Sequence, residues 1–384
     1  MISFFGHLSI LFGLGVAILG AAVSLFAAPA QQPSWAKWGR RAAFTVTGLV
    51  VFATGLMVFA LVTHDFSVKY VADVGSRSTP LYYTVISLWA ALEGSILFWA
   101  LLLSLYTVLF LSTVRDRFAD LQPYATGFLL LISAFFLFVI AFPGNPFALV
   151  NPAAPSPGCP ADGCGPNPLL QNHPMMGLHP PLLYLGYVGL SVPYAIAMAS
   201  LLSGSTSPEV LRLIRRWALV PWVFLSLGIT AGMWWSYAVL GWGGYWSWDP
   251  VENASVMPWL VTTAFLHSLQ VQERRRMLKT WTMSLIVAAW LLSIFGTFLT
   301  RSGVLASVHS FTQTAIGPVF LVFFGIFLLA SAALLVARSR DLGVAGTLDA
   351  TICRETAFLV NNLLLVAVTF TILLGTIFPL IAEA

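Results

Sequence analysis

Apolar runs of about 20 residues recur along the whole chain, and they limit its possible folds more than any other feature. A helix of that length crosses a hydrocarbon core of roughly 30 Å. Only 8% of the residues are charged, whereas a soluble globular domain carries about 25%. The runs are continuously apolar and lack the alternation of a transmembrane β-strand. The sequence therefore predicts an all-α, polytopic membrane protein, and it excludes a soluble enzyme, a coiled coil and a disordered chain.

The apolar runs predict about ten membrane spans within a single helical domain, 1–384. The spans are 3–27, 43–63, 80–112, 124–143, 180–203, 217–240, 258–272, 280–299, 316–337 and 357–380. The third is unusually long, and we expect it to break near Gly94. The first begins with MISFFGH, which contains no Lys or Arg, so we expect a retained membrane helix rather than a cleaved signal peptide.

Basic residues fall almost entirely in alternate loops. Of the 18 Lys and Arg residues, 15 lie in one set of loops: Lys37, Arg40, Arg41, Arg115, Arg117, Arg212, Arg215, Arg216, Arg274, Arg275, Arg276, Lys279, Arg338, Arg340 and Arg354. The other set holds Lys69, Arg77 and Arg301. The positive-inside rule places the first set in the cytoplasm and both termini on the opposite side. Topology thus explains the net charge of +4, and we expect membrane lipids but no nucleic acid as partners.

The expected outer loops are 64–79, 144–179, 241–257 and 300–315. Loop 144–179 is rich in Pro and Gly and longer than a simple connector, which often marks a functional segment. Cys159 and Cys164 lie in it, on the oxidising side if the outer compartment is a periplasm. A local disulfide and a pair of free thiols both agree with the sequence. Cys353 is expected to be a small apolar residue on the cytoplasmic side.

Six of the 14 tryptophans lie between Trp234 and Trp259, around the segment WGGYWSWDPVENASVMPWL at 242–260. Tryptophan also favours membrane interfaces, but that preference does not explain so dense a cluster with glycines before it and acidic residues after it. Aromatic rings form a flat apolar surface, and glycines let a planar ligand approach the backbone. We expect this loop to bind a flat macrocycle with ionised edge groups, through Trp242, Gly243, Gly244, Trp246, Trp248, Asp249, Glu252 and Trp259.

Three histidines are candidate metal ligands. His267 is expected near mid-membrane, where an ionisable residue is costly and usually functional. His179 and His309 lie in the outer loops that flank the tryptophan segment, and two imidazoles from opposite sides supply both axial positions of a haem iron. Each alone is equally compatible with a helix cap or an interface position. Arg301 is a candidate partner for a haem propionate or for an acidic side chain of the tryptophan segment.

The tryptophan-rich segment resembles the "WWD" signature of haem-handling proteins in cytochrome c maturation. The signature alone also admits the haem-delivery protein CcmC and the CcsA-type synthases. The further segments NPLLQNHPMMGLHPPLLYLGYVG, LWAALEGSILFW and GTFLTRSGVLASVHSF resemble the CcmF haem lyase family specifically. The resemblance runs over essentially the whole chain.

The resemblance implies a haem lyase component in the bacterial inner membrane whose active face is periplasmic. Haem would arrive on the chaperone CcmE and be joined by thioether bonds to the Cys-x-x-Cys-His motif of apocytochrome c, with CcmH and CcmI assisting. His179 and His309 correspond to the periplasmic haem ligands. His267 matches one of two membrane histidines that hold a b-type haem, which passes electrons from quinol. Family members are usually longer, so we expect another chain or segment to supply the second membrane histidine.

The sequence contains no recognisable nucleophile–base pair, so the expected mechanism is positional: the outer loops orient haem toward the cysteines of the substrate. A competing class is a haem carrier or exporter of the CcmC or CcsA type, which forms no bond. A third is a secondary transporter with Glu93 and His267 as proton-coupling residues. That class predicts inverted internal repeats, and inspection of the sequence reveals none.

Overall fold

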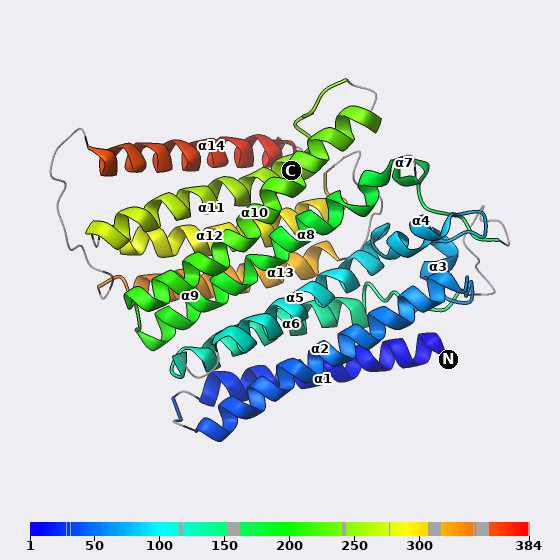
Figure 1. The fold of residues 1–384 in the computed structure, drawn as a ribbon, viewed down its shortest axis with the longest axis horizontal. Helices are drawn as coiled ribbons and strands as arrows, with labels where there is room; N and C mark the ends of the chain where they lie inside the picture. Colours follow the sequence, from blue (N-terminus) through cyan, green and yellow to red (C-terminus); the bar gives the residue numbers. More distant parts are fainter. Residues whose placement is uncertain are drawn as a thin grey trace. The chain divides into compact units, whose positions relative to one another are not determined.

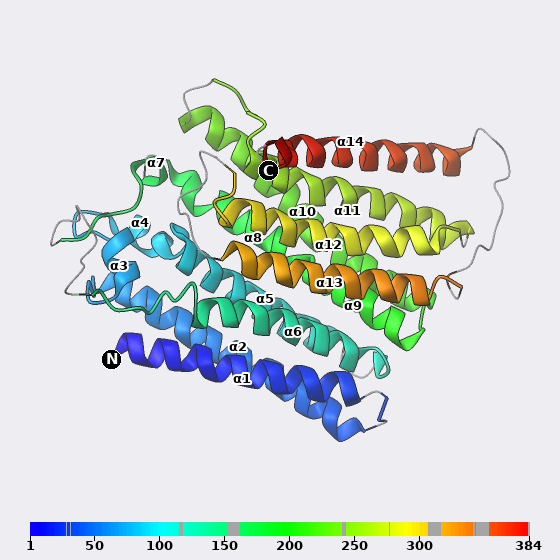
Figure 2. The ribbon, with the colours of Figure 1, turned by 180° about the vertical axis from the view of Figure 1, so that it is seen from behind.

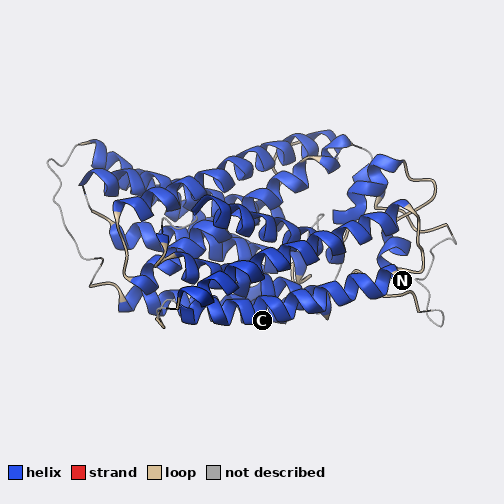
Figure 3. Ribbon diagram, turned by 60° about the horizontal axis from the view of Figure 1, so that its bottom comes forward, coloured by secondary structure: helices blue, strands red, loops and turns tan. Residues whose placement is uncertain are grey.

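The computed structural model describes residues 1–27, 29–30, 32–114, 118–151, 162–171, 173–239, 243–275, 277–305, 316–340, 342 and 353–382. All regular elements in these ranges are helices, as Figure 3 shows, and one isolated antiparallel bridge joins Val68 to Leu149. The predicted all-α class is therefore confirmed.

Figure 1 follows the helices in chain order. They are α1 (Ile2–Ala27), α2 (Pro33–Val62), α3 (Lys69–Val74), α4 (Leu81–Ile86), η1 (Ser87–Trp89), α5 (Leu92–Val114), α6 (Gln122–Ala141), α7 (Pro168–Gln171), η3 (Pro174–Gly177), α8 (His179–Gly189), α9 (Ser191–Ser203), α10 (Pro208–Val239), α11 (Pro250–Arg275), α12 (Lys279–Arg301), α13 (Gly317–Ala337) and α14 (Arg354–Ala382).

Nine helical stretches among the described residues are long and apolar enough to cross a membrane. They correspond to nine of the ten expected spans and confirm a polytopic membrane protein. The tenth, 258–272, lies in α11, which is helical over 26 residues but too polar to meet the same criterion. Several of its polar residues are buried, namely Asn253, Ser255, Thr262, Ser268 and Gln272. The helices α12 and α14 contact α11 and run beside it in Figures 1 and 2.

The break expected near Gly94 is present, and it lies just before that residue, between η1 and α5. The hydroxyl of Tyr70 lies 2.8 Å from the carbonyl oxygen of Ser87 and 3.0 Å from that of Leu88, carbonyls at the break. A Cβ at Gly94 would lie 2.1 Å from the Leu88 oxygen and 2.3 Å from the Tyr70 hydroxyl. Position 94 therefore requires glycine, because any side chain would collide with the residues that hold the break.

The chain divides into two compact units, and each is described separately. Unit 1 consists of Met1–Arg117, Thr126–Tyr184 and Ala231–Tyr245. Unit 2 consists of Phe118–Ala125, Leu185–Thr230 and Trp246–Ala384. The helices α6, α8 and α10 contribute residues to both units.

In unit 1, loops expected on the same side of the membrane lie together. The Lys69 amide donates to the Ala148 carbonyl (2.8 Å) and the Cys164 amide to the Ala72 carbonyl (3.0 Å), which joins the first two outer loops. At the basic end of the unit, Arg40 donates to the Leu111 carbonyl (2.7 Å). Cys164 is disulfide-bonded, while Cys159 lies outside the described residues.

In unit 2, the helix ends that carry basic residues also contact one another. Arg215 of α10 pairs with Glu273 of α11 (3.1 Å), and Arg275 of α11 pairs with Glu355 of α14 (3.2 Å). Arg338, just after α13, donates to the Leu201 carbonyl of α9 (2.8 Å). Each unit therefore gathers its basic loops at one end, as a one-sided topology requires.

The interior of unit 2 is held by a stacked aromatic pair. Tyr194 of α9 and Trp290 of α12 are fully buried, with ring centroids 3.9 Å apart. The Trp290 indole donates to Ser191 (3.1 Å), and the Tyr194 hydroxyl lies 2.9 Å from that of Ser331 on α13. Because every polar tip has a partner, the pair joins three helices without an unsatisfied group.

Candidate functional site

His179 begins α8 in unit 1, and its ring lies against the end of α10. Its centroid is 5.6 Å from that of Trp235, in an edge-to-face arrangement. A Cβ at Gly232 would lie 2.6 Å from Cε1 of His179. Because glycine has no side chain, the imidazole can approach the α10 backbone at position 232. Gly232 and Trp235, on one turn of α10, therefore set the position of the His179 ring, which is the predicted iron ligand.

An exposed aromatic surface, formed by Trp234, Tyr237 and Tyr245, lies at the same end of α10. All three side chains are more than half exposed. The rings of Tyr237 and Tyr245 stack with centroids 4.7 Å apart. His173 lies near Trp234 (6.2 Å between centroids), but its Nδ1 accepts the Met175 amide and caps η3. This cap gives His173 a local structural role.

Gly243 and Gly244, two predicted binding residues, both belong to unit 1. Gly243 has a φ of +66°, a backbone conformation that costs glycine little. A Cβ there would meet nothing within 4 Å, so its backbone dihedral, rather than a packed neighbour, calls for glycine. The Gly244 carbonyl accepts the Ser236 hydroxyl (3.4 Å). This contact joins the segment beginning at Gly243 to the last turns of α10.

Asp249 and Glu252, in unit 2, form a capping box at the start of α11. Asp249 Oδ1 accepts the Val251 amide (2.9 Å). Glu252 Oε2 accepts the amides of Asp249 (3.3 Å) and Ser247 (2.8 Å). Asp at the N-cap, Pro250 next and Glu at the third helical position are the residues that this motif favours. Both carboxylates therefore cap α11, and the haem-binding role predicted for them stays a prediction.

Trp246 and Trp248 lie on the same segment of unit 2, with ring centroids 6.3 Å apart. Trp248 has a φ of +62° and a side chain that is 66% exposed. An apolar ring held outward in a rare backbone conformation indicates a functional constraint. Trp246 Nε1 is buried and, among the described residues, has no hydrogen-bond partner.

Trp259 has a different environment from the rest of the predicted set. Its indole donates to the Ser226 hydroxyl on α10 (2.8 Å). This contact joins two helices within unit 2, and it gives Trp259 a role in helix packing.

His267 lies on α11 and is half-buried. Its Nδ1 is 2.7 Å from Nδ2 of Asn361 on α14, and its ring centroid is 5.4 Å from that of Phe358. Sequence reasoning missed Asn361. The signal for it was the pair Asn361-Asn362 in an otherwise apolar run, where polar side chains need partners.

Trp242, His309 and Arg301 complete the predicted set. Trp242 and His309 lie outside the described residues. Arg301 ends α12 and is half-buried.

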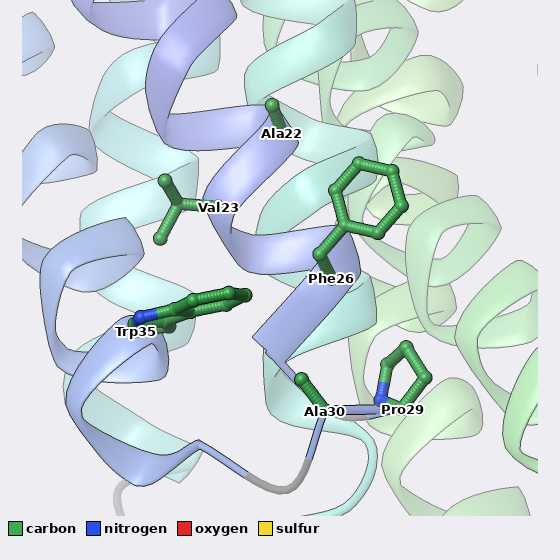
Figure 4. Close-up of a pocket in the computed structure, with 6 residues that line it drawn as sticks. All are labelled: Ala22, Val23, Phe26, Pro29, Ala30 and Trp35. Carbon is green, nitrogen blue, oxygen red and sulfur yellow. The ribbon is translucent and has the colours of Figure 1, made fainter.

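An apolar hollow of about 570 Å³ lies beside the turn between α1 and α2 in unit 1 (Figure 4). Its lining residues are Ala22, Val23, Phe26, Pro29, Ala30 and Trp35. None of the predicted site residues lines it, and it offers no ionisable side chain.

The described residues fit a haem in three respects. The imidazoles of His179 and His267 are ligand types suited to iron. The indole N–H groups of Trp235 and Trp246 are both buried, and neither has an acceptor among the described residues. Because a buried unpaired donor is costly, each such group indicates a missing acceptor. The exposed rings at 234, 237 and 245 in unit 1, and separately the exposed ring of Trp248 in unit 2, are apolar faces of the kind that a planar macrocycle needs.

Fold and site together define a polytopic helical membrane protein that carries histidines and an exposed aromatic segment. Comparison with known proteins narrows this class. A model of the family "Cytochrome C assembly protein" matches residues 89–305. The chain belongs to this family, as the sequence resemblance predicted.

Individual relatives are similar over nearly the whole chain. Cytochrome c-type biogenesis protein CcmF of Pseudomonas aeruginosa is 41% identical over 384 residues, covering 100% of this chain and 58% of that protein. Its namesake from Escherichia coli is 41% identical over 368 residues, covering 96% and 56%. The solved structure of "Cytochrome c Heme Lyase CcmF" matches with a TM-score of 0.81 and 36% identity, covering 100% of this chain and 58% of that one. The chain thus spans somewhat more than half the length of these relatives.

Proposed function

We propose that this chain is the haem-positioning part of a haem lyase in bacterial cytochrome c maturation. It receives haem from a periplasmic chaperone of the CcmE type and orients it for attachment to the Cys-x-x-Cys-His motif of apocytochrome c. The observation that carries the proposal is the placement of His179 against Trp235 and Gly232, on the helix end that also exposes Trp234 and Tyr237. The similarity to proteins named CcmF supports it.

The chain acts by holding and orienting rather than by acid–base chemistry. When bound, haem supplies two vinyl groups, and a substrate thiol adds across each so that a C–S and a C–H bond form without net oxidation. When haem is bound, His179 and His309 would hold the iron, and Trp246 and Trp248 would supply apolar contacts to the ring. The capping box of Asp249 and Glu252 fixes the segment that carries both rings. Fixed orientation and exclusion of water supply the rate effect.

His267 has a separate role as one ligand of a b-type haem that receives electrons from quinol and keeps the substrate iron reduced. Its half-buried position on α11, with Nδ1 engaged and Nε2 without a partner among the described residues, supports this assignment. CcmH and CcmI present the apocytochrome.

The proposed topology places the aromatic segment and both termini in the periplasm and the basic loops in the cytoplasm of a bacterial inner membrane. The gathering of basic loops at one end of each unit supports this orientation. The cytochrome-binding face is then the outer surface near α8 and the end of α10.

The test compares three histidine variants in cells that depend on this protein for cytochrome c maturation. His179→Ala should abolish covalent haem in a co-expressed apocytochrome while the purified protein keeps its b-haem spectrum. His267→Ala should lose that spectrum. His64→Ala is the control, because its Nδ1 contacts only nearby carbonyls at the end of α2 (3.1 Å to Leu61). Normal maturation in the His179 variant would refute the proposal.

A further inference from the structure

Among the described residues, the candidate membrane histidine His267 makes one side-chain hydrogen bond, and its partner is Asn361. Nδ2 of Asn361 lies 2.7 Å from Nδ1 of His267, within normal hydrogen-bond distance. An amide nitrogen only donates, so Nδ1 accepts here and a neutral ring carries its proton on Nε2. Phe358, one turn earlier on α14, packs on the same imidazole. Two residues of a single helix therefore orient the ring.

The position of Asn361 is itself fixed, because α14 is joined to α11 at three levels. Arg275 pairs with Glu355 at the basic end (3.2 Å). The contact between His267 and Asn361 follows, and at the far end Asn253 donates to the Thr376 hydroxyl (3.1 Å). These contacts set both the rotation and the axial register of α14.

The composition of the α14 contact surface supports the same conclusion. Among the described residues of α14, the buried ones are all polar: Asn362, Thr369 and Thr376. They recur every seven residues, which places them along one stripe of the helix. Thr376 accepts a hydrogen bond from Asn253 of α11 (3.1 Å), as polar residues at membrane helix contacts do. Thr369 donates to the Leu365 carbonyl of its own helix (2.8 Å), and the buried carboxamide of Asn362 has no hydrogen-bond partner among the described residues. At Thr376 the polar stripe therefore faces α11.

The hydrogen bond has a chemical consequence for the imidazole. A neutral histidine can bind a metal through Nε2 only if Nδ1 carries the proton, and Nδ1–H then needs an acceptor. The carboxamide of Asn361 supplies a donor in one orientation and, after a half-turn, an acceptor at the same place. A leucine of similar size supplies neither.

We infer that Asn361 is the positioning residue of His267: by turning its carboxamide from donor to acceptor, it sets the imidazole tautomer and frees Nε2 to bind iron. The inference rests on the proposed b-haem role of His267. Asn361 and His267 are 94 positions apart, so the sequence alone does not pair them.

Two substitutions of similar size distinguish hydrogen bonding from packing. Asn361→Leu preserves bulk and removes the acceptor, so the full-length chain in detergent should bind ferric haem b about 10- to 100-fold more weakly, as loss of a ligand's hydrogen-bond partner does. Asn361→Asp keeps an acceptor and should bind haem about as tightly as wild type. A stronger acceptor makes the imidazole more basic, so we expect the ferric state to be favoured about tenfold, which is 59 mV for one electron. Thr371→Ala is the control, because its exposed hydroxyl donates only to the Ala367 carbonyl of its own helix (3.0 Å).

A readout without haem completes the test. The ¹⁵N shifts of His267 in the haem-free chain should report a proton on Nε2 in wild type and a loss of that preference in Asn361→Leu. If Asn361→Leu binds haem like wild type while His267→Ala does not, the inference fails and the proposed function stands. If His267→Ala also binds haem normally, the b-haem role of His267 fails. If the leucine variant does not fold, the inference is tested by the His267 tautomer in the wild type and by the aspartate variant. A proton on Nδ1 of His267 in the haem-free wild type overturns the inference.

Discussion

Trp222 and Trp259 are joined by two reciprocal hydrogen-bonded paths across α10 and α11. The Trp222 indole donates to the Thr263 hydroxyl (2.9 Å), which donates to the Trp259 carbonyl (2.8 Å). In return, the Trp259 indole donates to the Ser226 hydroxyl (2.8 Å), which donates to the Trp222 carbonyl (2.8 Å). Each hydroxyl therefore both accepts and donates. The loop closes within unit 2 and leaves neither indole N–H available for a ligand.

Trp259→Phe tests whether this residue packs helices or binds haem. The substitution removes the indole donor, and we expect the unfolding free energy in detergent to fall by about 1 kcal/mol, within the range for a membrane hydrogen bond. Haem retention should stay unchanged, whereas Trp248→Phe should reduce it. A double variant with Trp222→Phe should lose less than the sum of the single losses, because the two paths share their groups. Loss of haem in Trp259→Phe with unchanged stability would contradict the packing role.

Gly232→Ala tests whether the His179 ring must lie against the α10 backbone at position 232. A Cβ there would approach Cε1 of the imidazole to 2.6 Å, so the ring must move. We expect cytochrome maturation to fall about tenfold or more, since a displacement of about 1 Å at a reacting site has effects of that size. The control is Gly48→Ala in the same unit, where a Cβ would meet nothing within 4 Å. Equal maturation by the two variants would show that His179 does not need this position.

Asp249→Asn tests whether Asp249 is needed as a helix cap or for its negative charge. Asn caps a helix as well as Asp does, while Ala costs about 1 kcal/mol. We therefore expect Asp249→Asn to keep wild-type haem retention and Asp249→Ala to lose both stability and haem. Glu252→Gln should behave like the Asn variant, because Gln also completes a capping box. The assay is thermal unfolding together with the haem spectrum, and haem loss in the two amide variants would assign the negative charges to ligand binding instead.

Glu355→Gln tests the link between the start of α14 and α11. Loss of the ion pair with Arg275 should let the first turn of α14 open more often. Cys353, the free cysteine among the described residues, lies directly before that turn and its Sγ is 3.2 Å from the Thr356 hydroxyl. We expect maleimide to label it roughly two- to fivefold faster, the size of effect typical of a partly exposed ion pair. Exchanging the charges, with Arg275→Glu and Glu355→Arg, should restore slow labelling.

Properties that depend on neighbouring residues in the chain were predictable from the sequence. Apolar length located nine spans, since a helix must satisfy its own backbone in lipid. Glycine in a long apolar run signalled the break that Tyr70 holds at Leu88. The Asp-Pro-Val-Glu order was visible too, and the ligand-binding role predicted for its two carboxylates stays a prediction. Its capping geometry needed only the residues from Asp249 to Glu252.

Contacts between distant segments were not predictable in this way. In the sequence, Trp259 cannot be distinguished from Trp246 and Trp248. Its contact with Ser226, which lies 33 residues away in the chain, shows that Trp259 packs against α10. His267 was recognised as costly in a membrane, yet its partner Asn361 depends on how α14 rotates against α11. Sequence periodicity reports the faces of a helix but not the neighbour that each face meets, because that neighbour is selected by packing and by hydrogen bonds formed only after the helices assemble.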